Sequence, residues 1–232
     1  MSKKKIVILT GAGISAESGI STFRDAGGLW EGHDVMEVAS PDGWKKNKEL
    51  VLTFYNQRRA QLHEVQPNAG HIALAELDKH FEVCIITQNV DDLHERAGSV
   101  RVVHLHGELL KARSTQDSNL VYDWPKDIAI GDTCEKGSQL RPHIVWFGKA
   151  VPLIEAAAQI SSIADIFMVI GTSMQVYPAA GLIGYVDDAA PKFFVDPKPA
   201  TIPGVKNLKV LAEPATVALP GLVKELIEKY AK

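Results

Sequence analysis

The chain has 232 residues with 25 basic and 28 acidic side chains, and 46% of its residues are hydrophobic. This length allows one sizeable core, or one domain that carries a smaller one. The net charge of −3 argues against nucleic-acid binding, which requires a clearly basic surface. No apolar run reaches the ~18 residues of a membrane span, and the run Ile6–Leu9 is shorter than the ~7 residues of a signal-peptide core. We therefore expect a cytoplasmic protein that binds neither nucleic acid nor membrane.

Short apolar runs recur along the chain and predict strands. In chain order they are Lys5–Thr10, Phe81–Thr87, Arg101–Leu105, His143–Phe147, Ile166–Ile170, Phe193–Val195 and Leu208–Leu211. Their hydrophobicity is nearly continuous rather than alternating, which is typical of strands covered on both faces. Helical patterns lie between several of them, at Ala69–Lys79, Leu153–Ile163 and Leu219–Tyr230. This alternation predicts an α/β fold with a doubly wound, Rossmann-like parallel sheet.

Two stretches interrupt the alternation of strands and helices. The first, Gly32–Val65, is helical and amphipathic without a strand partner, and the second, Arg113–Gln139, is polar and rich in turns. We expect two insertions, residues 32–65 and 113–139, to form a second, smaller domain. Residues 1–31, 66–112 and 140–232 then form the Rossmann-like domain. Ligands of such sheets usually bind at the carboxyl ends of the strands, here in the cleft between the two domains.

The turn after the first strand carries the most informative pattern. It reads GAGISAESGISTFR from Gly11 to Arg24, followed by GGLW from Gly27 to Trp30. Glycines directly after a strand let the backbone approach a pyrophosphate, and the next helix N-terminus favours the anion. A tight strand–helix turn would explain the glycines alone about as well. The whole segment, however, resembles the NAD-binding signature of the sirtuin family almost letter for letter.

Four further segments resemble sirtuin motifs and follow in the order of the family. They are TQNVDDLH at 87–94, LHG at 105–107, VWFG at 145–148 and GTS at 171–173. The resemblance covers nearly the whole chain and implies that NAD is a co-substrate. At Asp196 the family commonly has asparagine, which contacts the adenosine ribose, and a carboxylate can accept the same hydrogen bonds. The NAD contacts implied by the resemblance are Gly11, Ala12, Gly13, Ser15, Glu17, Thr22, Phe23, Arg24, Trp30, Gln88, Asn89, Val90, Asp91, Gly171, Thr172, Ser173, Asp196 and Ala215.

The catalytic candidates are His106 and Asn89. Spacing alone does not separate His106 from His104, because residues two apart on a strand share a face. The Leu-His-Gly context favours His106, and a histidine that titrates near neutrality suits a general base acting on a ribose hydroxyl. The resemblance implies that Asn89 orients the nicotinamide ribose and that Asp91 contacts the nicotinamide amide, although both residue types also cap helices. It further implies release of nicotinamide and O-acyl-ADP-ribose.

A helical pattern at Asn47–Glu64 carries the acyl-group candidates. Tyr55 and Arg58 lie three residues apart and therefore share a helix face. The Tyr-x-x-Arg pair resembles that of sirtuins that remove succinyl, malonyl or glutaryl groups, and a guanidinium can bind a terminal carboxylate bidentately. We expect a desuccinylase or demalonylase that also deacetylates; the other interpretation is a solvated helix face. The resemblance places the backbone of the acylated substrate against Val145, Trp146 and Phe147.

The chain departs from the family at the structural zinc site. Sirtuins usually carry two Cys-x-x-Cys pairs, and these positions are Ser114 and Asp117, then Cys134 and Gly137. One thiol cannot build a tetrahedral zinc site, and the second cysteine, Cys84, lies inside a predicted strand. We therefore expect no zinc, and a small domain that is stabilised instead by packing of Leu120, Tyr122, Trp124 and Ile128.

The partners that the resemblance implies are acylated lysines of proteins, and we expect a monomer. Two other functions use the same NAD site. An ADP-ribosyltransferase would leave no O-acyl-ADP-ribose, and a non-catalytic NAD sensor would need no general base, so His106 speaks against the sensor.

Overall fold

The structure is a computed structural model that describes residues 3–21, 29–30 and 32–231. Its larger sheet has six parallel strands in the order β11-β10-β9-β1-β4-β5. The chain reverses its direction of winding at β1, so the carboxyl ends of β1 and its neighbours border a ligand-binding crevice. The predicted fold class is confirmed. The strands are β1 (Lys5–Thr10), β4 (Glu82–Thr87), β5 (Val102–His104), β9 (Ile166–Ile170), β10 (Lys192–Val195) and β11 (Leu208–Leu211).

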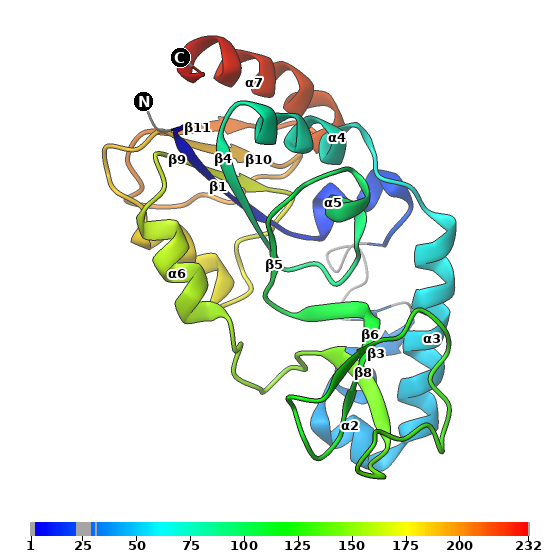
Figure 1. Ribbon diagram of the computed structural model, residues 1–232. Coiled ribbons are helices and arrows are strands. Elements are labelled where there is room, and N and C mark those ends of the chain that lie inside the picture. Colours follow the sequence, from blue (N-terminus) through cyan, green and yellow to red (C-terminus); the bar gives the residue numbers. More distant parts are fainter. Residues whose placement is uncertain (1–2, 22–28, 31, 232) are drawn as a thin grey trace.

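Helices cover both faces of this sheet, as Figure 1 shows. Along β1, Ile6 and Ile8 pack toward α4 (Ala69–Glu76) and α7 (Ala215–Tyr230). The alternate residues Val7 and Leu9 pack with α6 (Ile154–Ser162) and the 3-10 helix η4 (Ala179–Tyr185). Because both faces are buried, the strands read as continuous apolar runs. Within the described residues, no helix has the length and apolar character that a membrane crossing needs.

A smaller lobe with its own core lies at the bottom right of Figure 1. Its helices are α1 (Val35–Val38), α2 (Pro41–Lys46) and α3 (Lys48–Glu64). Each helix begins where a side chain accepts a hydrogen bond from a backbone N–H of the first turn: Asp34, Ser40 and Asn47. The lobe also contains a two-stranded sheet of β2 (Leu29–Trp30) and β3 (His33–Asp34), and a three-stranded antiparallel sheet of β7 (Val121–Asp123), β6 (Gly107–Ser114) and β8 (Leu140–Ile144).

The strand predicted at His143–Phe147 was wrong in both place and partner. The structure has β8 at Leu140–Ile144, paired antiparallel with β6 rather than parallel in the large sheet. A bulge between Glu108 and Ala112 of β6 lets the two strands stay paired past Pro142, which has no N–H to donate. The three-stranded sheet thus includes residues on both sides of the 113–139 insertion.

The turn around Ser114 and the turn around Cys134, where the sirtuin resemblance implies pairs of cysteines, contact each other. The Ser114 hydroxyl accepts from the backbone N–H of Asp117 at 3.2 Å and from the Cys134 thiol at 3.5 Å. An ion pair of 2.7 Å joins Asp117 to Lys136. Close by, Ile128 is fully buried, and Leu120, Tyr122 and Trp124 pack against the same core. Among the described residues, no group of three or more His, Cys, Asp or Glu side chains could hold a metal.

Candidate active site

A cavity of about 560 Å³ lies between the two lobes. Its walls come from the segments that follow β1, β4, β9 and β10, and from α3 and the end of β8. Most of the predicted site residues line it together: Gly11, Ala12, Gly13, Tyr55, Arg58, Gln88, Asn89, Val90, Asp91, His106, Val145, Trp146, Phe147, Gly171, Thr172, Ser173 and Asp196. One cavity therefore unites the segments predicted for NAD, for catalysis and for the acyl group.

Three predicted NAD residues lie outside the cavity wall. Ser15 is fully buried behind it, Glu17 is exposed and hydrogen-bonded to Thr216, and Ala215 is buried at the start of α7. The predicted residues Thr22, Phe23 and Arg24 lie outside the described residues. Trp30 is described only by its place in β2. A role of Ser15 can only be indirect, through the groups that it contacts.

The glycine turn after β1 packs directly against the turn after β9. The N–H of Gly13 donates to the carbonyl of Gly171 at 2.7 Å. A Cβ on Gly13 would lie 2.7 Å from that oxygen, and a Cβ on Gly171 would lie 2.3 Å from the backbone nitrogen of Ile14. Gly171 also has a φ of 60°, in the left-handed region. Both positions require glycine for the backbones to approach.

We expect Gly171→Ala to lower the free energy of unfolding by about 2–4 kcal/mol, because it adds backbone strain to a clash with fixed backbone. Chemical denaturation measures this change. Gly184→Ala is the matched control, since no atom lies within 4 Å of the Cβ that it would add. Equal effects of the two substitutions would contradict the importance of this close approach.

A buried polar network positions the groups after β4. The Asn89 side-chain amide donates to the Ser15 hydroxyl at 3.1 Å, and that hydroxyl donates to the Asp91 carboxylate at 3.1 Å. Asn89 and Asp91 are 8% and 6% exposed. Burial raises the pKa of Asp91, while hydrogen bonds from the Leu93 N–H and the Ser15 hydroxyl act against that rise. Ser15 therefore orients two cavity side chains without lining the cavity itself.

His106 lies between β5 and β6 with its ring held by the neighbouring segment. Its Nδ1 lies 3.0 Å from the carbonyl oxygen of Gln88. Because a carbonyl only accepts, Nδ1 carries the proton in the neutral ring and Nε2 is the free base. Burial lowers the pKa of His106, although the Gln88 carbonyl partly opposes this effect. His106 is thus a neutral base near pH 7, and it is the histidine of the pair 104 and 106 that lines the cavity.

Tyr55 and Arg58 lie on one face of α3 and line the cavity together, as their spacing predicts. Tyr55 is fully buried and Arg58 is 7% exposed. Burial raises the pKa of Tyr55, and three arginines act in the opposite direction, namely Arg58, Arg141 and Arg59. Because both side chains are buried, they do not form a solvated helix face, and Arg58 places a guanidinium at this end of the cavity.

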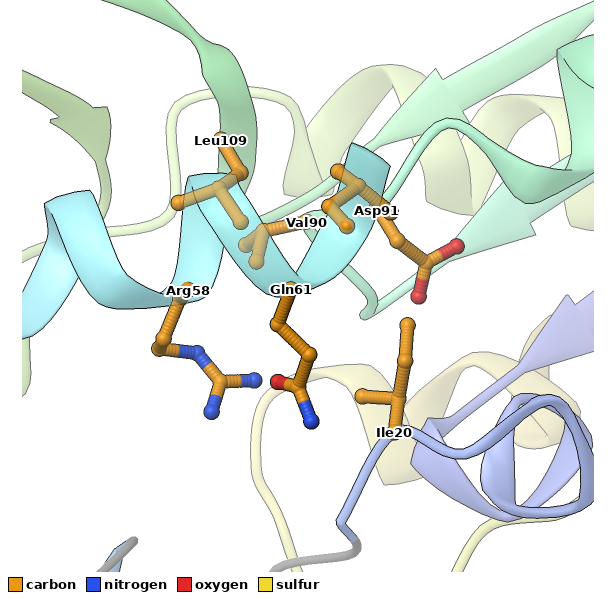
Figure 2. A pocket seen from close by; sticks show the side chains of 7 residues that line it. Ile20, Arg58, Gln61, Val90, Asp91 and Leu109 are labelled. Atoms are coloured by element: carbon orange, nitrogen blue, oxygen red, sulfur yellow. The ribbon is translucent and has the colours of Figure 1, made fainter. Parts of the chain in front are cut away.

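A small crevice beside the main cavity connects the acyl and nicotinamide candidates. Figure 2 shows Arg58 and Gln61 projecting from α3 toward the side of the crevice where Ile20 and Asp91 lie. Arg58 and Asp91 line this crevice as well as the main cavity. The group that would bind a terminal carboxylate and the group that would bind nicotinamide therefore border one space.

Two buried histidines support the network from behind. The His71 and His94 rings lie 5.0 Å apart between centroids. His71 accepts from the Asn68 N–H through Nδ1, and its Nε2 lies 3.5 Å from the Ser15 hydroxyl. Burial lowers the pKa of His71 to about 4 and lowers that of His94 well below its usual value. Both rings are neutral in the folded protein at neutral pH.

These depressed pKa values make the fold sensitive to acid. The unfolded chain protonates near pH 6.5, whereas folded His71 resists protonation until about pH 4. Its stabilising contribution is therefore complete above pH 6.5 and is lost as the pH falls toward 4. Between pH 7 and pH 5 we expect a loss of about 2 kcal/mol from this residue alone. Urea denaturation at both pH values measures the loss of unfolding free energy. We expect the loss to be about 2 kcal/mol smaller in His71→Gln than in the natural protein, and unchanged in the control His80→Gln.

Several cavity residues were not predicted from the sequence. Ile20 lies within the motif that follows β1, Lys198 lies two residues after Asp196, and Val176–Pro178 follows the GTS turn. An X-Pro pair after a strand indicates a loop, so Tyr177-Pro178 gave a signal for a loop at this edge. No pattern in the sequence indicates that the loop returns to the cavity, because this depends on packing between distant segments.

Comparison with known proteins agrees with this site. The Sir2 family profile matches residues 11–178. A Helicobacter pylori protein named NAD-dependent protein deacylase is 60% identical over 97% of this chain and 98% of its own length. A Bacteroides thetaiotaomicron protein of the same name is 52% identical over 97% of this chain and 98% of its own length.

Comparison with solved structures also finds Sir2 homologues. A Sir2 homolog–NAD complex has a TM-score of 0.87 and 38% identity, with 97% of this chain and 90% of that chain covered. Sir2 bound to acetylated peptide has a TM-score of 0.78 and 26% identity, with 98% and 93% covered. The resemblance of the five sequence motifs is thus matched by family profile, overall identity and fold, and the chain belongs to the Sir2 family.

Proposed function

We propose that this protein is an NAD-dependent protein-lysine deacylase that prefers succinyl- and malonyl-lysine and also removes acetyl groups. The observation that carries the proposal is that one cavity is lined by the glycine turn, by Asn89 and His106, and by Tyr55 with Arg58. All of these groups belong to one chain, which supports the expectation of a monomer. The names of the relatives and the acetylated-peptide complex of a Sir2 structure support protein lysines as the substrate.

The lining of the cavity fits NAD. Side chains on Gly11 or Gly13 would collide with the turn after β9, and their absence leaves bare backbone at the carboxyl end of β1. Asp196, at the end of β10, has a carboxylate suited to ribose hydroxyls, and Thr172 and Ser173 follow the neighbouring strand. When bound, NAD supplies an electrophilic ribose carbon and the ribose hydroxyl that receives the acyl group. We place the nicotinamide end near Asn89 and Asp91.

His106 is the proposed general base, and its free Nε2 would take a proton from a ribose hydroxyl. Asn89 is the proposed positioning group for the nicotinamide ribose, because Ser15 fixes its amide. Val145, Trp146 and Phe147 are the proposed contacts of the substrate backbone, since this segment borders the cavity directly after β8.

The proposed acyl preference rests on Tyr55 and Arg58, which line the cavity from α3. Arg58 can bind a terminal carboxylate bidentately, and the Tyr55 hydroxyl can add a hydrogen bond. An acetyl group offers no carboxylate to Arg58 and Tyr55, and a site built to bind polar groups disfavours ligands that lack them.

Product analysis tests the proposal against both alternatives. The protein is incubated with NAD and matched succinyl- and acetyl-lysine peptides, and the products are identified by mass spectrometry. We expect free lysine peptide, nicotinamide and O-acyl-ADP-ribose in equal amounts. ADP-ribosylated peptide without O-acyl-ADP-ribose would indicate a transferase, and no nicotinamide release under any condition would indicate a sensor.

We also propose that the small lobe folds without zinc, because a hydrogen bond between Cys134 and Ser114 and an ion pair between Asp117 and Lys136 join its two turns. Removing a structural zinc usually unfolds its domain. We therefore expect that prolonged treatment with a chelator changes neither the thermal midpoint nor the deacylation rate. Metal analysis of the untreated protein should find zinc far below one atom per chain. Stoichiometric zinc, or loss of the fold on chelation, would contradict this proposal.

A further inference from the structure

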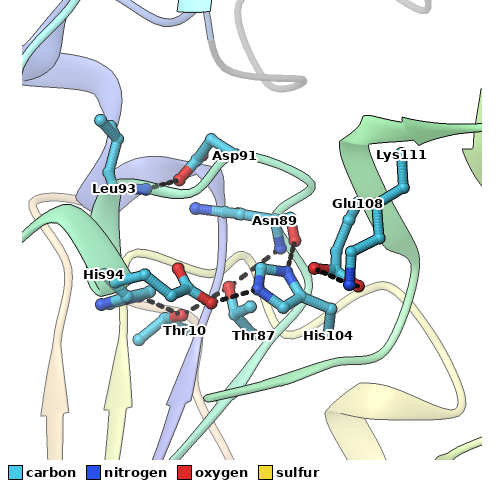
Figure 3. A network of polar contacts seen from close by, with 10 residues as sticks. Thr10, Thr87, Asn89, Asp91, Leu93, His94, His104, Glu108 and Lys111 are labelled. Carbon is cyan, nitrogen blue, oxygen red and sulfur yellow. Dashed lines mark hydrogen bonds and ion pairs between the residues drawn. The ribbon is translucent and has the colours of Figure 1, made fainter. Parts of the chain in front are cut away.

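Two histidines that are two residues apart contact two successive carbonyl groups. His106 Nδ1 lies 3.0 Å from the Gln88 oxygen, and His104 Nδ1 lies 3.1 Å from the Asn89 oxygen. Figure 3 shows the His104 ring directly beside Asn89. Since a carbonyl only accepts, both Nδ1 atoms carry a proton. The segment after β4, which presents Asn89 to the cavity, is therefore attached at two adjacent points to the end of β5 and the residues that follow it.

The other nitrogen of His104 contacts a carboxylate. Its Nε2 lies 2.7 Å from a Glu95 oxygen, and the His104 side chain is only 8% exposed. A carboxylate also only accepts, so a hydrogen bond here requires a second proton on the ring. The two contacts of His104 are satisfied together only when the ring is an imidazolium. No such requirement applies to His106, whose ring contacts one acceptor, the Gln88 carbonyl, among the residues that the structure describes.

Electrostatics agree with the geometry. Burial alone would lower the pKa of His104, but the Glu95 carboxylate and the Asn89 carbonyl hold it above its usual value. Burial alone would raise the pKa of Glu95, but its hydrogen bond with His104 holds it below its usual value. The charge-assisted bond between the two is of the stronger kind.

The other charged neighbours of His104 come from three segments. Asp91 in the loop after β4 and Glu108 on β6 add negative charge, although Glu108 also pairs with Lys111 at 3.0 Å. His94 on α5 (Leu93–Arg96) is a further titratable neighbour, and its burial keeps it neutral near pH 7. The surroundings of His104 thus favour a cation.

We propose that His104 is a positioning residue for the deacylation reaction: its imidazolium, held by Glu95, fixes the carbonyl of Asn89 and so the loop that presents Asn89 and orients His106. If the ring loses its proton, a single N–H remains. If that N–H donates to the Asn89 carbonyl, the lone pair on Nε2 faces the Glu95 carboxylate and repels it. If it donates to Glu95 instead, the hydrogen bond to Asn89 is lost. Either arrangement loosens the loop without touching substrate.

The proposal rests on the proposed deacylase activity and predicts a bell-shaped dependence of kcat/KM on pH. His106 must be neutral, which sets the acid limb below pH 6.5, and His104 must be charged, which sets an alkaline limb. The sign follows from the directions of the two pKa shifts, one lowered and one raised.

The decisive variant is Glu95→Gln, which keeps an acceptor of the same shape and removes its charge. We expect the alkaline limb to move to lower pH by about one unit, because a neighbouring opposite charge shifts a pKa by that much or more. The acid limb should stay in place. Glu76→Gln is the matched control, since Glu76 faces His80 in an exposed carboxylate–histidine pair at 4.0 Å. An unmoved alkaline limb in Glu95→Gln, or an equal scaling of kcat/KM at every pH, would overturn the proposal.

Nuclear magnetic resonance gives a readout that does not require activity. The His104 ring should titrate above pH 6.5 in the natural protein and at a lower pH in Glu95→Gln. The Val90 amide nitrogen, which is bonded to the Asn89 carbonyl carbon, should shift with the same midpoint and lose that shift in His104→Gln. Absence of deacylation with these titrations intact would refute the proposed function alone. A Val90 signal that does not follow His104 would refute the positioning role.

Discussion

Replacement of His106 by alanine should reduce kcat/KM for every acyl peptide by about 10²- to 10⁴-fold, the usual contribution of a general base. Since Nδ1 of the ring faces the Gln88 carbonyl, Nε2 is the nitrogen that would take the proton from the ribose, and the substitution removes it. The loss should be similar for succinyl and acetyl peptides, because His106 acts on the ribose and not on the acyl group. Steady-state kinetics with both peptides measures it.

The control for this substitution is His80→Ala, which removes a histidine from the surface. Thermal unfolding should show both variants folded, and NAD affinity measured by calorimetry should change little in His106→Ala, since many other groups line the cavity. Activity within a few-fold of the natural protein would exclude His106 as the base. Loss confined to one acyl type would place His106 in the acyl pocket instead.

Replacement of Arg58 by methionine should reduce kcat/KM for succinyl-lysine peptide by about 10- to 100-fold, the range expected for a hydrogen bond to a charged group. The value for acetyl-lysine peptide should stay nearly constant, because an acetyl group has no carboxylate for Arg58 to bind. Tyr55→Phe should have the same direction and a smaller effect, since it removes one neutral donor. The ratio of the two kcat/KM values isolates the acyl group from the rest of the reaction.

Arg101→Met is the matched control, because Arg101 is an exposed arginine directly before β5 and pairs with Glu82 at 4.0 Å. It removes the same formal charge from the molecule without altering the cavity. An equal fall for both peptides in Arg58→Met would indicate a structural role, and an unchanged succinyl value would remove the basis for an acidic preference.

The parallel sheet was predictable because strands that are buried on both faces have nearly continuous apolar sequences. The bounds of the buried strands Lys5–Thr10 and Ile166–Ile170 were predicted to the residue. Those of the edge strand Leu208–Leu211 were also predicted to the residue, although Lys209 and Val210 are exposed there. The prediction of a parallel strand at His143–Phe147 was wrong because an apolar run does not indicate which sheet the strand joins. Its pairing with β6 depends on a bulge and on a partner strand that contains polar residues, Glu108 and Arg113 among them.

The candidate site was predictable where local motifs end strands, since the carboxyl ends of parallel strands meet at one edge. This explains why Gly13, Asn89 and Thr172 line one cavity. Ser15 was placed in the site by its motif, but its position behind the wall depends on contacts with two other segments, the loop after β4 and helix α4. Likewise, period-two alternation could not separate His104 from His106, and the partners of each ring do.

A competition assay tests the central claim most directly. The protein receives saturating NAD and an equimolar mixture of two peptides that differ only in a succinyl or an acetyl group on one lysine. Mass spectrometry follows both O-acyl-ADP-ribose products in the same tube, so the ratio of initial rates equals the ratio of kcat/KM values. We predict that O-succinyl-ADP-ribose forms faster and that this preference disappears in Arg58→Met. Faster formation of O-acetyl-ADP-ribose by the natural protein would contradict the proposed function.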